Sequence, residues 1–198
     1  MARQASLHLS QAPEADRLLS TNPLALLIGM VLDQQVPLEW AFQAPHELQR
    51  RLGRPLDAGD LAAMAPDELV EVFCRRPALH RFPAANAARV QALCRLVVER
   101  HGGRAERVWT TAADATALAA NVRALPGFGD QKARIFVALL GKQLGVQPPG
   151  WREASAPFGE PGTTMSVADI VGPESLAAVR QAKKERKAAA RAAAAPPA

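Results

Sequence analysis

The sequence predicts an all-α fold, and three observations lead to that prediction. Apolar residues recur at helical spacing along most of the 198 residues, and no segment shows a convincing strand pattern. Gly and Pro residues divide the chain into segments of helix length. With 48% hydrophobic residues, the chain is able to bury a core as one helical domain.

The first half of the chain is expected to form six helices. They cover residues 13–19, 24–34, 38–52, 58–64, 66–75 and 84–100. Asp67 and Glu68 fall in the first turn of the fifth helix, where negative charge suits the helix dipole. The sixth is the longest amphipathic helix, with Cys94 and Val98 on its inward side, and the glycines at 102–103 end it. Cys74 also lies on an apolar helical side, so both thiols are expected to be buried and unpaired.

The second half is expected to contain a short turn near Val108, a pair of helices within about 113–143, a long loop at 148–164 and a last helix. The last helix starts at about Val167 or Pro173. We expect the helical domain to cover residues 1–179. Residues 180–198 form a basic tail rich in Ala, Lys and Arg, which is expected to be frayed or disordered at its end.

The pair of helices is joined by Leu125-Pro126-Gly127-Phe128-Gly129-Asp130-Gln131-Lys132-Ala133. Pro126 stops the first helix, while Gly127 and Gly129 permit backbone angles and close approaches that a Cβ would hinder. The turn opens directly into a helix N-terminus, whose free N–H groups attract an anion. The segment is therefore expected to hold a DNA phosphate; the alternative is an ordinary tight connection between helices.

This sequence resembles the helix-hairpin-helix motif of the HhH-GPD superfamily of DNA glycosylases, to which the endonuclease III-like base excision repair enzymes belong. The segment from Asn22 to Gln35 resembles the early buried helix of the same superfamily, which ends in a polar turn containing Gln. The resemblance covers about residues 20–145. It implies a two-lobed helical fold with a lesion pocket between the lobes, and double-stranded DNA as the partner.

The resemblance also implies which residues contact DNA. They are Gly127, Phe128, Gly129, Gln131 and Lys132 in the hairpin, Gln34 and Gln35 after the early helix, and Arg81 and Arg89 at a later helix start. The two glutamines have an alternative role in capping their own helix. The two arginines have an alternative role as solvated surface charges.

The catalytic carboxylate of the family lies some twenty residues after the hairpin, where this chain has Pro148 to Gly150. The carboxylates further on are Glu153, Glu160 and Asp169, and any of them is a candidate for stabilising positive charge on the sugar. Asp169 opens a helix, and its alternative role is a capping box with Ser166.

The nucleophilic Lys of the bifunctional family members stands two residues after the second hairpin glycine, where this chain has Gln131. Lys132 follows one residue later, which is a rotation of about 100° on a helix, so it is expected to contact phosphate instead. The resemblance therefore implies a monofunctional glycosylase that releases a base without forming a Schiff base.

Charge and cysteine content limit the remaining functions. The net charge is +5, with 24 basic and 19 acidic residues, but residues 180–198 hold six of the basic and one of the acidic ones, leaving 18 of each elsewhere. The tail is expected either to solubilise the protein or to act as an electrostatic arm on DNA. Two cysteines are too few for a four-thiolate iron–sulfur cluster, and His8, His46 and His101 show no metal-ligand spacing, so no cofactor or metal is expected.

We expect a cytoplasmic protein, associated with the nucleoid if it is bacterial, with no membrane contact, because no apolar run reaches membrane length and no signal-like segment is present. We also expect a monomer. Two functions remain. The first is a monofunctional DNA N-glycosylase that removes a damaged or mispaired base. The second is a catalytically inactive protein of glycosylase fold that binds lesions.

Overall fold

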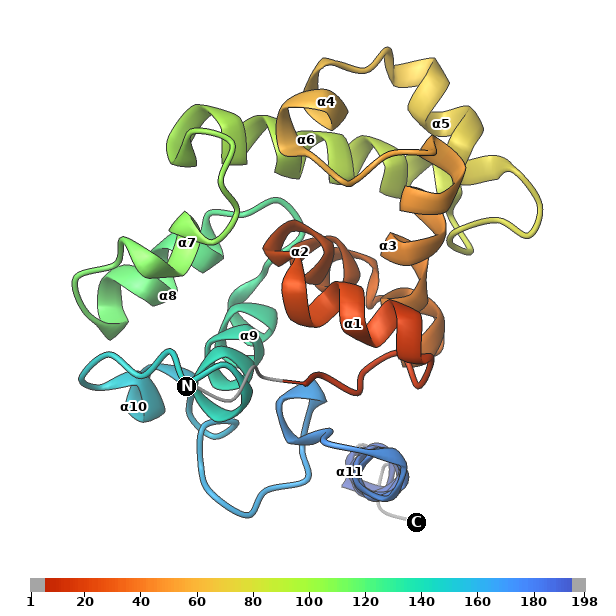
Figure 1. Cartoon of the computed structure of the whole chain (residues 1–198). Helices are drawn as coiled ribbons and strands as arrows, with labels where there is room; N and C mark the ends of the chain where they lie inside the picture. Colours follow the sequence, from red (N-terminus) through yellow and green to blue (C-terminus); the bar gives the residue numbers. More distant parts are fainter. Residues whose placement is uncertain (1–5, 194–198) are drawn as a thin grey trace.

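The computed structural model describes residues 6–193. The chain is 65% helix, and the described range contains no strand, which confirms the all-α prediction. The helices are α1 (Pro13–Thr21), α2 (Pro23–Leu32), α3 (Leu38–Leu52), α4 (Ala58–Ala63), α5 (Pro66–Cys74), α6 (Pro83–His101), α7 (Arg107–Thr110), α8 (Ala115–Arg123), α9 (Asp130–Gln143), α10 (Trp151–Ser155), the 3₁₀ turn η1 (Val167–Asp169) and α11 (Pro173–Ala193) (Figure 1).

Local sequence sets most of the helix ends. Five helices, α1, α2, α5, α6 and α11, begin with Pro, whose missing N–H is no loss in a first turn. Gly53 and Gly102 end α3 and α6 in the left-handed conformation. The starts of α2, α4 and α8 are capped by the side chains of Asn22, Asp57 and Asp114.

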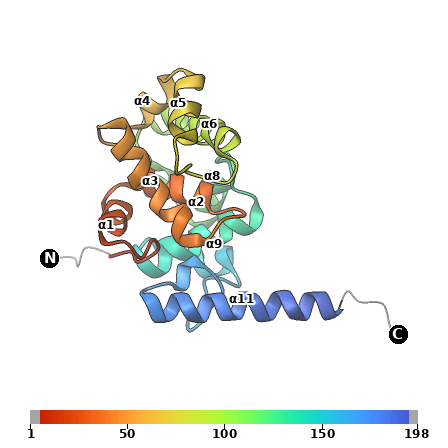
Figure 2. The ribbon, with the colours of Figure 1, turned by 90° about the vertical axis from the view of Figure 1, so that its right-hand side faces the viewer.

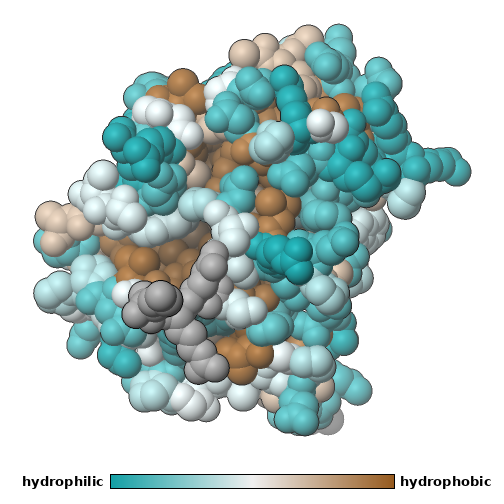
Figure 3. All heavy atoms as spheres, viewed as in Figure 1, coloured by the Kyte–Doolittle hydropathy of each residue, from teal (hydrophilic) through white to brown (hydrophobic). Residues whose placement is uncertain are grey.

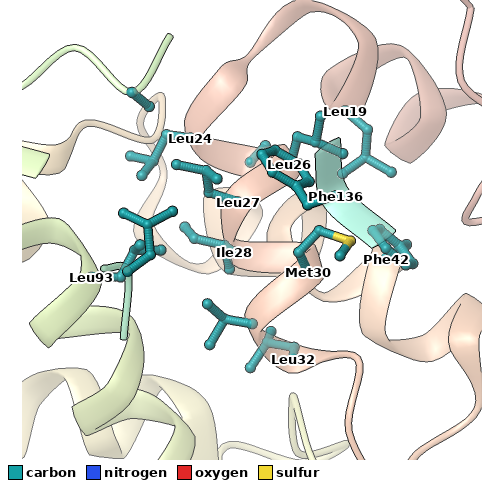
Figure 4. Packing of buried hydrophobic residues seen from close by; sticks show 14 of the residues in the cluster. Leu19, Leu24, Leu26, Leu27, Ile28, Met30, Leu32, Phe42, Leu93 and Phe136 are labelled. Carbon is teal, nitrogen blue, oxygen red and sulfur yellow. The ribbon is translucent and has the colours of Figure 1, made fainter. Parts of the chain in front are cut away.

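Helix α2 is the centre of the core. All residues from Leu24 to Leu32 are buried, and their side chains meet Phe42 of α3, Leu93 of α6 and Phe136 of α9 (Figure 4). A Cβ on Gly29 would lie 2.7 Å from a ring carbon of Phe42, so this glycine allows α2 and α3 to approach closely. Because the apolar surface of α2 is covered on all sides, α2 fixes the positions of the elements at its two ends.

The other helices form two groups around α2 (Figure 1). Helices α4 and α5 pack on α6, while α8, α10 and η1 pack on α9. Within residues 6–193 no single helix is long and apolar enough to cross a membrane. Only α1 and α2 taken together would meet that criterion, and they are bent by 115° from one another.

Helix α11 runs without a break across residue 180 and extends past the other helices (Figure 2). Its early part is anchored by Leu176 and Val179, which are buried. The basic segment is therefore helical at least to Ala193, and it continues the helix that starts at Pro173. The expected frayed end at 194–198 lies outside the described residues.

Three expectations about individual segments are wrong. The loop 148–164 contains a helix, α10, which packs against α8 and α9. Val98 is 40% exposed, although the neighbouring Val97 of α6 is buried. Cys74 is exposed at the last residue of α5, whereas Cys94 is buried.

In the view of Figure 3, hydrophilic side chains cover most of the surface, and apolar ones show mainly in its depressions.

Candidate nucleic-acid interface

The segment Leu125–Gly129 forms a tight hairpin between α8 and α9. The Phe128 N–H donates to the Leu125 carbonyl at 3.0 Å, and Gly127 takes the left-handed conformation with φ +84°. The Phe128 side chain is buried and packs edge-on against Phe136, with ring centroids 5.7 Å apart. Phe128 therefore anchors the hairpin through its side chain, and only its backbone is available at the surface.

The fold requires glycine at only one of the two hairpin positions. A Cβ on Gly127 would lie 2.9 Å from Cδ of Arg89 and would also be strained by the positive φ, so the fold requires glycine there. Gly129 has φ −75° and ψ 176°, which any residue adopts, and nothing lies within 4 Å of the position of its Cβ. The fold therefore does not require glycine at 129, and the start of α9 is left sterically open.

The first turn of α9 presents backbone N–H groups without a side-chain cap. Asp130 lies in this turn, where its negative charge would oppose an anion. Its carboxylate is engaged by Arg123 at 2.6 Å and by Arg134 at 3.4 Å, so the charge is largely compensated. Gln131 is exposed beside it.

Lys132 connects the start of α9 to the end of α2. Its Nζ donates to the Met30 carbonyl at 2.6 Å and makes a longer contact of 3.4 Å with the Val31 carbonyl. Burial lowers the pKa of this amine to about 8; Arg89 lowers it further, whereas Asp33 acts in the opposite direction. The ammonium thus caps the C-terminal end of α2. Because Lys132 is held there, its amine does not project from the hairpin surface, where a phosphate contact was expected.

The turn after α2 positions the two predicted glutamines. Asp33 has φ −71° and ψ 68°, and the Gln34 N–H donates to the Leu32 carbonyl at 2.7 Å, which makes an inverse γ-turn. Gln35 follows with φ +57° and is exposed. Neither glutamine side chain makes a hydrogen bond within residues 6–193, so the capping of α2 is done by Lys132.

A buried histidine ties this turn to the start of α6. His80 Nε2 lies 2.9 Å from the Gln34 carbonyl, while Nδ1 accepts from the Phe82 N–H at 3.0 Å and from the Asn86 amide at 2.7 Å. Because Nδ1 accepts two hydrogen bonds, the ring proton of neutral His80 lies on Nε2, which donates to the Gln34 carbonyl. Burial is the main reason that the pKa of His80 is lowered, in keeping with a neutral ring. The Asn86 oxygen in turn accepts from Arg89 at 3.0 Å.

Exposed aromatic side chains adjoin this network. Phe82 is 46% exposed and Trp40 is 39% exposed, and each ring is within 6.5 Å of the His80 ring. The guanidinium of Arg81 lies over the Phe82 ring at 5.4 Å. Aromatic rings and guanidinium planes of this kind stack on unpaired bases. The sequence signal was the order Arg-Phe-Pro immediately before a helix start.

A cavity of about 450 Å³ lies between the end of α2 and the start of α9. It is lined by Met30, Asp33, Gln34, Gly127, Gly129, Asp130, Gln131, Lys132 and Ile135. The structure thus brings together one predicted glutamine and four of the five predicted hairpin residues, with Arg89 packed across Gly127. Gln35 and Arg81 are exposed outside this lining.

Asp33 is the feature of the cavity that sequence reasoning missed. Burial raises the pKa of this carboxyl, and the charges of Lys183 and Lys132 partly oppose that shift. Within residues 6–193 its carboxylate has no hydrogen bond and no ion pair within 4.0 Å. A cavity that contains a carboxylate and an amine with shifted pKa values is typical of a functional site.

Asp169, the first catalytic candidate, is engaged on every side. Its oxygens accept from Lys142 at 2.6 Å, Thr163 at 3.0 Å, and the backbone N–H groups of Met165 at 2.8 Å and Ser166 at 3.1 Å. The capping box with Ser166 is present. Lys142 is in the last turn of α9, about 18 Å along the helix from the first turn at 1.5 Å per residue. The structure therefore does not bring Asp169 to the hairpin.

The other two carboxylate candidates also lie outside the cavity. Glu153 is exposed on α10, and Glu160 is exposed in the loop that follows α10. Neither lines the cavity beside the hairpin. Among residues 6–193, no group of three or more His, Cys, Asp or Glu side chains is placed to hold a metal ion.

Comparison of the chain with models of protein families, with curated proteins and with solved structures gives no match.

Proposed function

We propose that this protein binds double-stranded DNA through a helix-hairpin-helix made by α8, residues 125–129 and α9, and that it is a monofunctional DNA N-glycosylase. On this proposal the fold is a divergent, two-lobed HhH-GPD type, and the substrate is a damaged or mispaired base. The enzyme requires no iron–sulfur cluster. The protein acts as a monomer on duplex DNA.

One observation carries the proposal: the sterically open start of α9 lies directly beside a cavity that contains unpartnered polar groups. Gly129 leaves the N–H groups of α9 accessible to a phosphate, as an anion site at a helix N-terminus requires. The adjoining cavity of about 450 Å³ is within the size range of small-ligand pockets. A phosphate contact beside a pocket of that size suits an enzyme that extrudes one nucleotide from a duplex.

The surroundings of the cavity support the same assignment. Arg89 packs across Gly127, and Arg81 and the exposed rings of Phe82 and Trp40 follow on the adjacent surface. Basic side chains attract phosphate without regard to sequence, and exposed aromatic rings stabilise unstacked bases.

A panel of duplexes that each contain one lesion tests the proposal. Base release is scored by strand breakage in hot alkali, and binding is scored separately by fluorescence anisotropy. We expect one lesion class to show alkali-labile sites, with intact strands before alkali. Binding without base release across the panel would favour the second function, a catalytically inactive lesion-binding protein.

A separate observation favours the second function, a catalytically inactive lesion-binding protein. The chain has Pro148 to Gly150 where the family carries its carboxylate, and Asp169 has no acceptor site to spare. An enzyme of this kind requires a carboxylate elsewhere. Equal affinity for lesion-containing and undamaged DNA, with no base release, would exclude both functions.

A further inference from the structure

The carboxylate of Asp33 is poorly explained by the fold. It belongs to the residue that ends α2, it faces a cavity, and it has no hydrogen-bond partner within residues 6–193. The carboxylate oxygens are not sealed from solvent, so their acceptors are open to water or to a ligand in the cavity, while partial burial disfavours the charged form. By contrast, Asp169 uses its oxygens in four contacts. The contrast indicates that Asp33 is placed for a ligand.

We infer that Asp33 is the catalytic carboxylate of this cavity and that its substrate is the sugar of a nucleotide extruded from duplex DNA. The inference rests on the proposed function and assigns to it the residue that the family's spacing does not supply. Asp33 is beside the open start of α9, where the phosphate of such a nucleotide would be held.

The chemistry needs one proton acceptor and one negative charge. As the bond between C1′ and the base nitrogen breaks, its electron pair leaves with the base, and positive charge develops on the sugar. A water oxygen forms the new bond to C1′ and passes a proton to Asp33, while the base takes a proton from solvent. Ionised Asp33 both stabilises the developing cation and accepts this proton.

Charged groups from three helices line the cavity or act on the charges of Asp33 and Lys132. They are Lys132 and Asp130 from α9, Lys183 from α11 and Arg89 from α6, while His80 is buried next to the turn. The ammonium of Lys132 donates to the last carbonyls of α2, so the negative end of that helix dipole offsets part of its charge. The positive charges of Lys132 and Lys183 favour the ionised form of Asp33. We therefore treat the two lysines as positioning residues, which act on the reaction through Asp33.

The first test uses two duplexes, one with a neutral tetrahydrofuran abasic site and one with a cationic pyrrolidine abasic site. We expect the wild type to bind the cationic duplex about tenfold more tightly, since an anionic carboxylate meets a cation at short range. Asp33→Asn should abolish this preference and keep the affinity for the neutral duplex. Glu153→Gln, which removes an exposed carboxylate outside the cavity, is the matched control and should keep the preference.

The second test measures base release in single turnover. Asp33→Asn should slow the step by about 10²- to 10⁴-fold, the range for loss of a general base. Asp169→Asn, Glu153→Gln and Glu160→Gln should retain activity in the folded fraction. The wild-type rate should fall as the pH drops through the pKa of Asp33. Lys183→Ala should move this acid limb to higher pH, whereas its exposed neighbour Lys184→Ala should not.

The outcomes separate the inference from the function on which it rests. A cation preference that persists in Asp33→Asn, or undiminished base release by that variant, would overturn the inference alone. Tight binding of both abasic duplexes with no preference between them would do the same. If the wild type binds neither abasic duplex better than undamaged DNA and releases no base, the proposed function fails and the inference fails with it. Asp33→Ser serves as a second variant if Asp33→Asn is unstable.

Discussion

On the proposed function, replacing Gly129 with Asp should stabilise the protein and weaken its binding to DNA. Gly129 is the N-cap of α9, and its backbone angles suit Asp, whose side chain accepts hydrogen bonds from the next N–H groups. A better cap adds a few tenths of a kcal/mol, and a negative charge at the helix start adds about 0.3–1 kcal/mol. The melting temperature should therefore rise by about 1–4 °C for a chain of this size.

The same charge should repel the DNA phosphate. Nothing lies within 4 Å of the Cβ position at residue 129, so the new carboxylate would project into the open space in front of α9. Two like charges about 4 Å apart repel by roughly 1 kcal/mol in water and 4 kcal/mol near a protein surface. We take about 2 kcal/mol, which is a loss of roughly 30-fold in affinity for every duplex, with or without a lesion.

Fluorescence anisotropy with an undamaged and a lesion-containing duplex measures the loss, and thermal unfolding measures the gain in stability. Gly129→Asn adds a cap of the same shape without charge and should lose less affinity. Gly172→Asp is matched in charge at the residue before α11, where nothing lies within 4 Å of the Cβ position, and it should bind normally. Full affinity in a folded Gly129→Asp variant would remove the hairpin from the DNA interface.

Three further outcomes are expected. Borohydride should trap no protein–DNA adduct, because the amine of Lys132 is held by the end of α2; an adduct that disappears in Lys132→Ala would make it a nucleophile instead. Deletion after Val179 removes six basic residues and should flatten the dependence of DNA affinity on salt, with lesion preference unchanged; an unaltered slope would leave the tail as a solubiliser. Lys142→Met removes the cationic partner of Asp169, whose side chain is only 5% exposed. The variant should be less stable by about 2 kcal/mol, which lowers the melting temperature by roughly 4–8 °C. An unchanged melting temperature would show that this ion pair contributes nothing to stability.

The sequence was a sound guide wherever a short segment carries its own physical signal. The helical period set most helices, and Pro at their first turns and Gly at their ends set many of the boundaries. The sequence Ser-Val-Ala-Asp at 166–169 also contained the capping box that the structure shows, because all of its partners are within four residues. The helix α10 was missed, since five residues are too few to form a stable helix by themselves and α10 is stabilised mainly by packing on α9.

The candidate site depended on contacts between residues far apart in the chain. The hairpin glycines could be read from local sequence, yet only the structure separates Gly127, which the fold requires, from Gly129, which it does not. Lys132 looked like a surface residue, because its partner at Met30 is 102 positions away.

By itself, the sequence determined the helical class, the core helix α2, the hairpin between α8 and α9 and the basic composition of the C-terminal segment. Each follows from neighbours along the chain: apolar period, glycine and proline placement, and charge. Only the tertiary structure decided that Asp33 faces the cavity without an ion pair, whereas Asp130, which also lines the cavity, is paired with Arg123 and Arg134. Solvation and charge are set by groups that folding brings together. Asp33 acquires its environment from α9 and α11, whereas Asp169 is neutralised by Lys142 at the far end of α9.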